Sequence, residues 1–212
     1  DRPLRKAAFE AYYNRLGEFK NTVAAALDGQ FKQLRFFSDA RNYPTTLAAA
    51  LDGNEVPEEV YENLIDAVHA NMDKMYRYVA LRKKLLGVEE LHMYDVYTPL
   101  VPDAKQKISF DEAKETVLAA LAVLGEDYTD LLKKGFAERW IDVYENQGKR
   151  GGAYSTDVSR PHPYVLLNHK DTLDGMFTLA HEMGHALHSW HSCKNQPVCT
   201  SDYVIFVAEV AS

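Results

Sequence analysis

The sequence has only two cysteines, no long apolar run and no excess of positive charge. Its longest apolar run, residues 117–124, is far too short to cross a bilayer, so we expect no membrane-spanning segment. The formal net charge of −7 and the pI of about 5.6 argue against a nucleic-acid partner. An apolar content of 46% is ordinary for a globular protein.

The two cysteines, Cys193 and Cys199, flank a short polar stretch. As a disulfide they would indicate an oxidising compartment, and as free thiols a cytosolic one. We favour free thiols, and with them a cytoplasmic protein. No secretory signal is present, but the chain starts at Asp1 without a methionine, so the alternative of a removed signal stays open. Zinc ligation by these cysteines is a third and remoter interpretation.

The most informative stretch is His181-Glu182-Met183-Gly184-His185, an H-E-x-x-H pattern. On a helix, two histidines four residues apart lie about 40° apart around the axis and share one face. Both can therefore reach one metal ion about 2.0–2.1 Å from their ring nitrogens. Glu182 points about 100° to the side, which suits a group that takes a proton from water rather than binding the metal. The alternative is an ordinary helix with two surface histidines and an acid.

The context of the motif favours a metal site. Apolar residues precede and follow it, at 176–180 and 186–187, so the helix is expected to be buried and its polar groups need partners. A third ligand is expected at Glu209, a lone acid in the apolar run 204–211, which we interpret as a buried helix. His188 lies two turns from His181 on the same helix, so we interpret it as a hydrogen-bonded neighbour of the site.

The motif and its surroundings resemble a known family. Residues 181–189, 195–197 and 208–212 are similar to the thimet-oligopeptidase-like zinc metallopeptidases, in the oligoendopeptidase F branch, and the likeness extends upstream through 151–155, 163–168, 76–84 and 93–97. The resemblance implies that His181, His185 and Glu209 bind one Zn²⁺ ion per chain and that Glu182 is the general base. Cys199 departs from the family pattern, where an aromatic residue is expected.

The resemblance also implies the fold and the activity. We expect a mainly α, zincin-like metallopeptidase with a small β element beside the active-site helix. The expected function is hydrolysis of short oligopeptides by a metal-activated water, with Glu182 as general base. Gly152, Ala153 and Tyr154 would hold the substrate as an added strand, although a glycine-rich turn into a hairpin fits them equally well. The alternative functions are a non-catalytic helical protein with a structural zinc, and a zinc hydrolase acting on another amide.

The remaining pattern predicts a helical lobe over residues 1–100, which the resemblance makes a channel wall, and part of a catalytic domain over 101–212. Residues 92–108 lack a helical period and are the expected joint. Family members are longer on both sides, so we expect an internal fragment, truncated at its C-terminus, that is weakly active or inactive alone. The oligomeric state stays open.

Periodicity predicts individual elements as well. Helical patterns cover residues 3–37, with a possible interruption at Gly29, and 57–86, with a methionine and valine stripe interpreted as core. Ser109 and Glu112 form a capping box that opens a helix ending at Gly125. A further helix is expected over 128–146, and short strands over 153–155 and 164–167.

Overall fold

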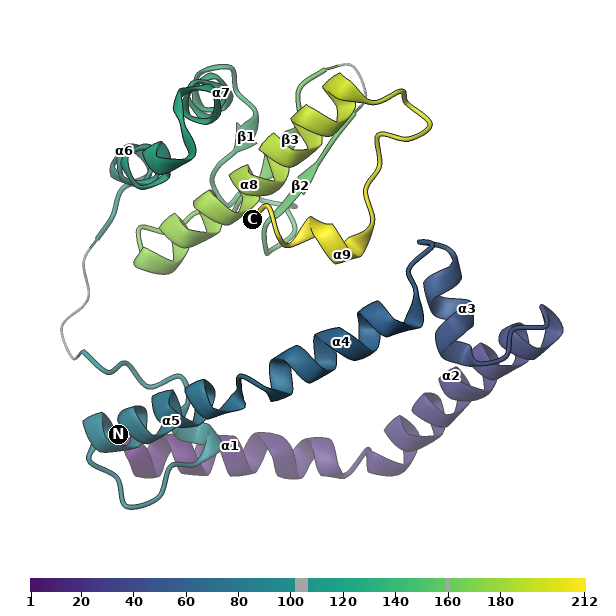
Figure 1. Cartoon of the computed structure of the whole chain (residues 1–212). Coiled ribbons are helices and arrows are strands. Elements are labelled where there is room, and N and C mark those ends of the chain that lie inside the picture. Colours follow the sequence, from purple (N-terminus) through teal and green to yellow (C-terminus); the bar gives the residue numbers. More distant parts are fainter. Residues whose placement is uncertain (102–106, 159–160) are drawn as a thin grey trace. The chain divides into compact units, whose positions relative to one another are not determined.

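The computed structural model describes residues 1–101, 107–158 and 161–212, and divides into two compact units, Asp1–Pro102 and Asp103–Ser212 (Figure 1). Unit 1 denotes the first and unit 2 the second. No helix in the described part of the chain is long and apolar enough to cross a membrane. The mainly helical fold with a small sheet confirms the predicted fold class.

Unit 1 consists of helices. They are α1 (Arg2–Gly17), α2 (Lys20–Ala40), α3 (Thr46–Asp52), α4 (Glu58–His69), α5 (Met72–Leu86) and the short 3₁₀ helix η1 (Met93–Asp95). Side-chain caps define two of the starts: the Asp1 carboxylate accepts from the amide of Leu4, and the Thr45 hydroxyl from that of Ala48. Gly87, at φ 63°, ends α5 in the left-handed conformation that glycine favours.

The helix expected over 57–86 is in fact two helices, because α4 ends at His69 and α5 begins at Met72. Asn71 lies in the break, and its side-chain amide donates to the carbonyl of Ala67, a local bond that competes with helix continuation. The expected interruption at Gly29 was wrong as well. Helix α2 runs through Gly29, and the chain breaks earlier, between Gly17 and Lys20.

Most of the apolar stripe that was interpreted as core over residues 57–86 is exposed, and Met72 is half-buried. Leu64 and Val68 are 54% and 53% exposed, and Met75 is 55% exposed. The interpretation failed because a helical period shows that a helix has an apolar face, whereas burial depends on what packs against that face.

A charged cluster holds the two ends of unit 1 together. The buried carboxylate of Asp95 accepts from the guanidinium groups of Arg2 at 3.0 Å and Arg5 at 3.1 Å. Arg82 donates to the Asp95 carbonyl at 3.0 Å. These bonds join α1, α5 and η1. The hydrogen bond from Arg2 is the largest cause that holds the pKa of Asp95 well below its ordinary value, against the opposing effect of burial.

Unit 2 combines helices with a small sheet. Its elements are α6 (Phe110–Ala120), the 3₁₀ helix η2 (Leu121–Leu124), α7 (Glu126–Ala137), β1 (Ile141–Asp142), β2 (Tyr154–Thr156), β3 (Tyr164–Leu166), α8 (Leu173–Asn195) and α9 (Ile205–Ala208). The strand order is β1-β3-β2, with β1 parallel and β2 antiparallel to the central β3. Because β3 is central, β2 forms one edge of the sheet. Figure 1 shows α8 lying against this sheet.

The sequence predicted some of these elements well. The capping box of Ser109 and Glu112 opens α6, and the strands expected at 153–155 and 164–167 are β2 and β3 within one residue. The helix expected over 128–146 ends early, at Ala137. Arg139 adopts a positive φ of 62°, which ends the helical path, and the chain then enters β1.

The apolar core of unit 2 lies where α6, α7 and the sheet meet α8. Helix α8 contributes Leu179, Met183, Ala186 and Leu187, each at most 1% exposed. Trp140 packs opposite them and stacks on Trp190 at 5.2 Å between ring centroids. Burial of this face fixes the rotation of α8, and therefore determines where its polar face points.

Candidate metal centre

Helix α8 presents its two motif histidines together on one face. The hydroxyl of Thr172 accepts from the amide of Gly175 and caps the start of the helix. His181 and His185 follow further along the helix, one turn apart, and their Nε2 atoms lie 3.2 Å from each other. The buried apolar face described above leaves both rings on the accessible side, with His181 exposed and His185 half-buried.

Glu209 completes a group of three possible ligands. Its Oε2 atom lies 3.6 Å from Nε2 of His181 and 3.6 Å from Nε2 of His185. Donors about 2.0–2.1 Å from a tetrahedral ion lie about 3.3–3.4 Å from one another, so this spacing fits zinc. Within the described ranges this is the one such group of histidine, cysteine or acidic side chains.

The surroundings of Glu209 differ from the expectation. Residues 204–211 were expected to form a buried helix, but α9 spans only Ile205–Ala208, and Ile205 and Val210 are 66% and 81% exposed. Glu209 follows directly as the C-cap, with its side chain 66% exposed. The burial argument for this ligand was therefore wrong, because α9 is too short to bury a face.

Glu182 lies beside the three possible ligands but is buried, at 7% exposure. Burial raises the pKa of its carboxyl group, and the charge of Glu209 adds to this effect, while His181 and His185 oppose it. Glu182 and His181 line a cavity of about 780 Å³, whose wall also includes Ala153 and Thr178. Glu182 thus lies at the wall of an open space beside His181.

His188 does not join the group of possible ligands. Its ring stacks on Tyr203, with centroids 3.8 Å apart and planes at 17°. Its Nδ1 atom is buried and has no partner among the described residues, and burial lowers the pKa of the imidazole. This geometry makes His188 a contact for the segment that leads to Glu209.

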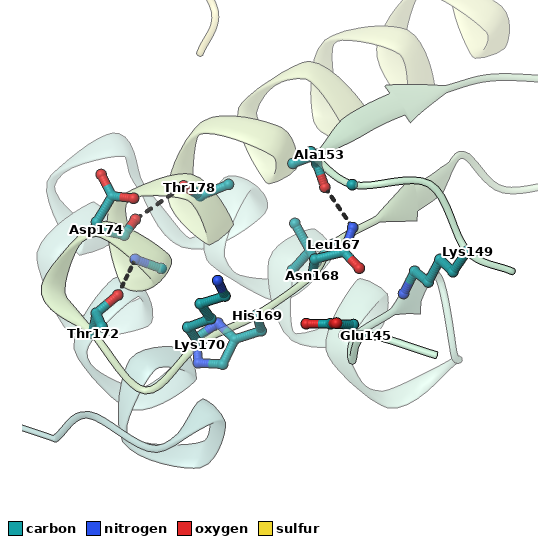
Figure 2. Close-up of a pocket in the computed structure, with 13 residues that line it drawn as sticks. Glu145, Lys149, Ala153, Leu167, Asn168, His169, Lys170, Thr172, Asp174 and Thr178 are labelled. Carbon is teal, nitrogen blue, oxygen red and sulfur yellow. Dashed lines mark hydrogen bonds between the residues drawn. The ribbon is translucent and has the colours of Figure 1, made fainter. Parts of the chain in front are cut away.

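The predicted substrate residues lie at the start of the edge strand. Gly152 has a φ of 95°, which favours glycine, and Tyr154 begins β2 with 53% of its surface exposed. Figure 2 shows the side-chain amide of Asn168 reaching the carbonyl before Ala153. This amide donates to the carbonyls of Gly152 at 2.8 Å and Arg150 at 2.9 Å. Asn168 therefore holds the glycine loop against the end of β3, a role that the sequence analysis did not identify.

Ala153 lies in the walls of two cavities. It lines the cavity beside Glu182 and also a second one, of about 470 Å³, at the N-terminal end of α8 (Figure 2). The side chains of Glu145, Asn168 and Lys170 line the second cavity.

Both cysteines are free thiols, as predicted. The thiol of Cys193 donates to the carboxylate of Asp157 at 3.0 Å, and Cys199 is exposed.

Comparisons of the sequence with known proteins match the whole chain to one family. The sequence model of peptidase family M3 matches residues 1–212. Oligopeptidase PepF of Bacillus subtilis (strain 168) is 47% identical over 212 residues, which are 100% of this chain and 32% of the relative. Group B oligopeptidase PepB of Streptococcus agalactiae is 43% identical, over 100% of this chain and 35% of the relative. The chain spans about a third of the length of these curated relatives.

Solved structures share the fold of this chain. The crystal structure of a Chlamydophila abortus protein matches with a TM-score of 0.85 and 40% identity, covering 100% of this chain and 35% of that one. Oligoendopeptidase-F from Enterococcus faecium matches with a TM-score of 0.62 and 34% identity, covering 100% of this chain and 30% of that one.

Proposed function

The chain belongs to peptidase family M3, and we propose that it is part of a zinc-dependent endopeptidase that hydrolyses short oligopeptides. One observation carries the proposal: the possible ligand atoms of His181, His185 and Glu209 all lie within 4.8 Å of one another, and the buried Glu182 lies beside them. The names of the relatives, an oligopeptidase and an oligoendopeptidase among them, support the substrate class.

His181, His185 and Glu209 would hold one Zn²⁺ ion. Two imidazoles and one carboxylate form a ligand set found in catalytic zinc sites, which leaves the fourth position open. When bound, zinc supplies Lewis-acid chemistry: it polarises a carbonyl group and makes water a stronger acid. The separations of 3.2 and 3.6 Å between the donor atoms support this assignment.

Glu182 would act as the general base. Its carboxylate takes a proton from the attacking water and then gives that proton to the departing amine of the peptide. A carboxyl group whose pKa is raised by burial is better matched to both transfers at neutral pH than an exposed one. A purely structural zinc site has no use for such a base, so Glu182 favours catalysis over the alternative of a non-catalytic zinc protein.

The substrate would lie along the free edge of β2. Backbone groups of Gly152, Ala153 and Tyr154 bind an extended peptide without regard to its side chains, which suits an enzyme for varied oligopeptides. The hydrogen bonds from Asn168 to the glycine loop support this role, because they fix the backbone that the peptide would meet.

The two parts of the chain would have different roles in this enzyme. Residues 101–212 would belong to the catalytic domain and residues 1–100 to a channel wall, and the enzyme would be cytoplasmic.

The test replaces Glu182 by glutamine in the full-length protein. Glu182→Gln keeps the shape but removes the proton acceptor, so cleavage of an internally quenched peptide should fall by about 10²–10⁴-fold while zinc stays bound. Glu115→Gln, an exposed position on α6, is the matched control and should cleave normally. Turnover of Glu182→Gln close to that of the wild type would remove Glu182 from the mechanism.

A further inference from the structure

We propose that Tyr203 is a positioning residue for Glu209: it anchors the segment before α9 on α8, so that the carboxylate stands over the two histidines. The proposal rests on the zinc site proposed above. The Glu209 side chain is two-thirds exposed and follows a helix of only four residues, so contacts elsewhere must hold it in place.

The first anchor lies on the C-terminal half of α8. The ring of Tyr203 stacks on His188 at 3.8 Å, and its hydroxyl lies 2.9 Å from the Ser189 hydroxyl, within hydrogen-bond distance. Next to it, the hydroxyl of Ser192 donates to the carbonyl of the buried Ser201. The segment that enters α9 is thus held by residues that follow His185 on the same helix.

The second anchor lies between the two histidines. A Cβ atom on Gly184 would come within 2.3 Å of the carbonyl oxygen of Ala211 and 2.8 Å of Cα of Ser212. The chain after Glu209 therefore crosses α8 where only glycine leaves room. Figure 1 shows this path, in which the yellow segment leaves the end of α8 and returns through α9 to the middle of that helix.

The two anchors bracket Glu209 on the helix that carries the other ligands. Between them, Ile205, Val207 and Val210 are exposed, whereas Phe206 and Ala208 are half-buried, so this segment is only partly packed. A ligand on a loosely packed segment must be ordered when the metal binds, and this ordering lowers the affinity. Prior fixation of both ends removes much of that cost. The hydroxyl of Tyr203 is engaged with Ser189, which favours an anchoring role over direct chemistry.

The test measures zinc affinity in the full-length protein by competition with a chromophoric chelator. Tyr203→Leu removes both the stack and the hydroxyl, and should weaken zinc binding by about 10–100-fold, the range for residues that orient metal ligands. Tyr203→Phe keeps the stack and should lose less. Tyr164→Leu is the matched control, since the ring centroid of Tyr164 lies 4.6 Å from that of His162, a histidine of unit 2 that is not among the three possible ligands.

A double-mutant cycle separates positioning from general structural damage. If Tyr203 acts through Glu209, Tyr203→Leu should cause no further loss of affinity in a Glu209→Ala background. Ser189→Ala provides a milder variant in case Tyr203→Leu does not fold, and its loss should match that of Tyr203→Phe without adding to it. The visible absorption of the cobalt-substituted protein should change in Tyr203→Leu and Glu209→Ala alike, because both disturb the same ligand.

The outcomes are distinguishable. A loss from Tyr203→Leu that persists undiminished in the Glu209→Ala background would overturn the positioning role while leaving the proposed ligands in place. Normal zinc affinity in Tyr203→Leu would do the same. Normal affinity in Glu209→Ala alone would overturn the ligand set, and the positioning role with it.

Discussion

Units 1 and 2 both contain amphipathic helices, yet their apolar faces have different fates. In unit 2, the face of α8 that carries Leu179 and Met183 is fully buried. In the described part of unit 1, the buried side chains are Ser38, Leu51, Arg82 and Asp95, most of them polar, while apolar residues along α1, α2, α4 and α5 are exposed. The same helical period thus accompanies a packed core in unit 2 and exposed apolar faces in unit 1, because the burial of a helix face depends on the element that packs against it.

The largest expected contrast concerns leucine truncation in the 212-residue chain. Leu132 of α7 is fully buried, so Leu132→Ala should lower the free energy of unfolding of unit 2 by about 2–5 kcal/mol. Leu64 of α4 is 54% exposed, so Leu64→Ala should change stability by no more than about 0.5 kcal/mol. Denaturant unfolding checks both: tryptophan fluorescence reports on unit 2, which holds Trp140 and Trp190, and circular dichroism reports on all helices. Equal losses would show that the face of α4 is covered in solution.

A smaller effect concerns the cluster that stabilises unit 1 in place of an apolar core. The pKa of Asp95 is lowered in the folded state, so its ionised form stabilises the fold at pH values above its unfolded pKa of about 3.9. That stability is lost as the pH falls through the lower, folded pKa. Asp95→Asn should therefore unfold more easily than the wild type at pH 7, and the difference should shrink below about pH 4.

Thermal unfolding followed by circular dichroism across this pH range checks the expectation. Asp39→Asn is the matched control, since Asp39 pairs with Arg35 on the exposed surface of α2 and should change the midpoint little. A difference between wild type and Asp95→Asn that stays constant from pH 7 to pH 2 would contradict the role given to the ionised carboxylate.

The sequence predicted the part of the site that depends on local spacing. A four-residue step brings His181 and His185 together on any regular helix, and the apolar residues around them predicted the burial of α8. Glu209 was predicted from the family resemblance and from a burial argument, and the burial argument was wrong because the Glu209 side chain is 66% exposed. The break at Asn71 and the strand β1 were missed, since each depends on a local competition that periodicity does not resolve.

The positioning contacts could not be predicted because they join distant residues. Asn168 bonds to a carbonyl 16 residues away, and Tyr203 contacts a serine 14 residues away on another element. Nothing in the local pattern of either residue specifies such a partner. An asparagine directly after a strand, such as Asn168, is the one sequence signal that could have indicated a loop contact.

The most direct test of the account is the zinc content and zinc affinity of the full-length protein, compared with those of Glu209→Ala and His188→Ala. The wild type should bind one ion per chain. Glu209→Ala removes a direct ligand and should weaken binding by more than about 100-fold, whereas His188→Ala removes only the stack under Tyr203 and should stay within about 10–100-fold. An equal loss in the two variants, or a larger one for His188→Ala, would contradict the proposed ligand set.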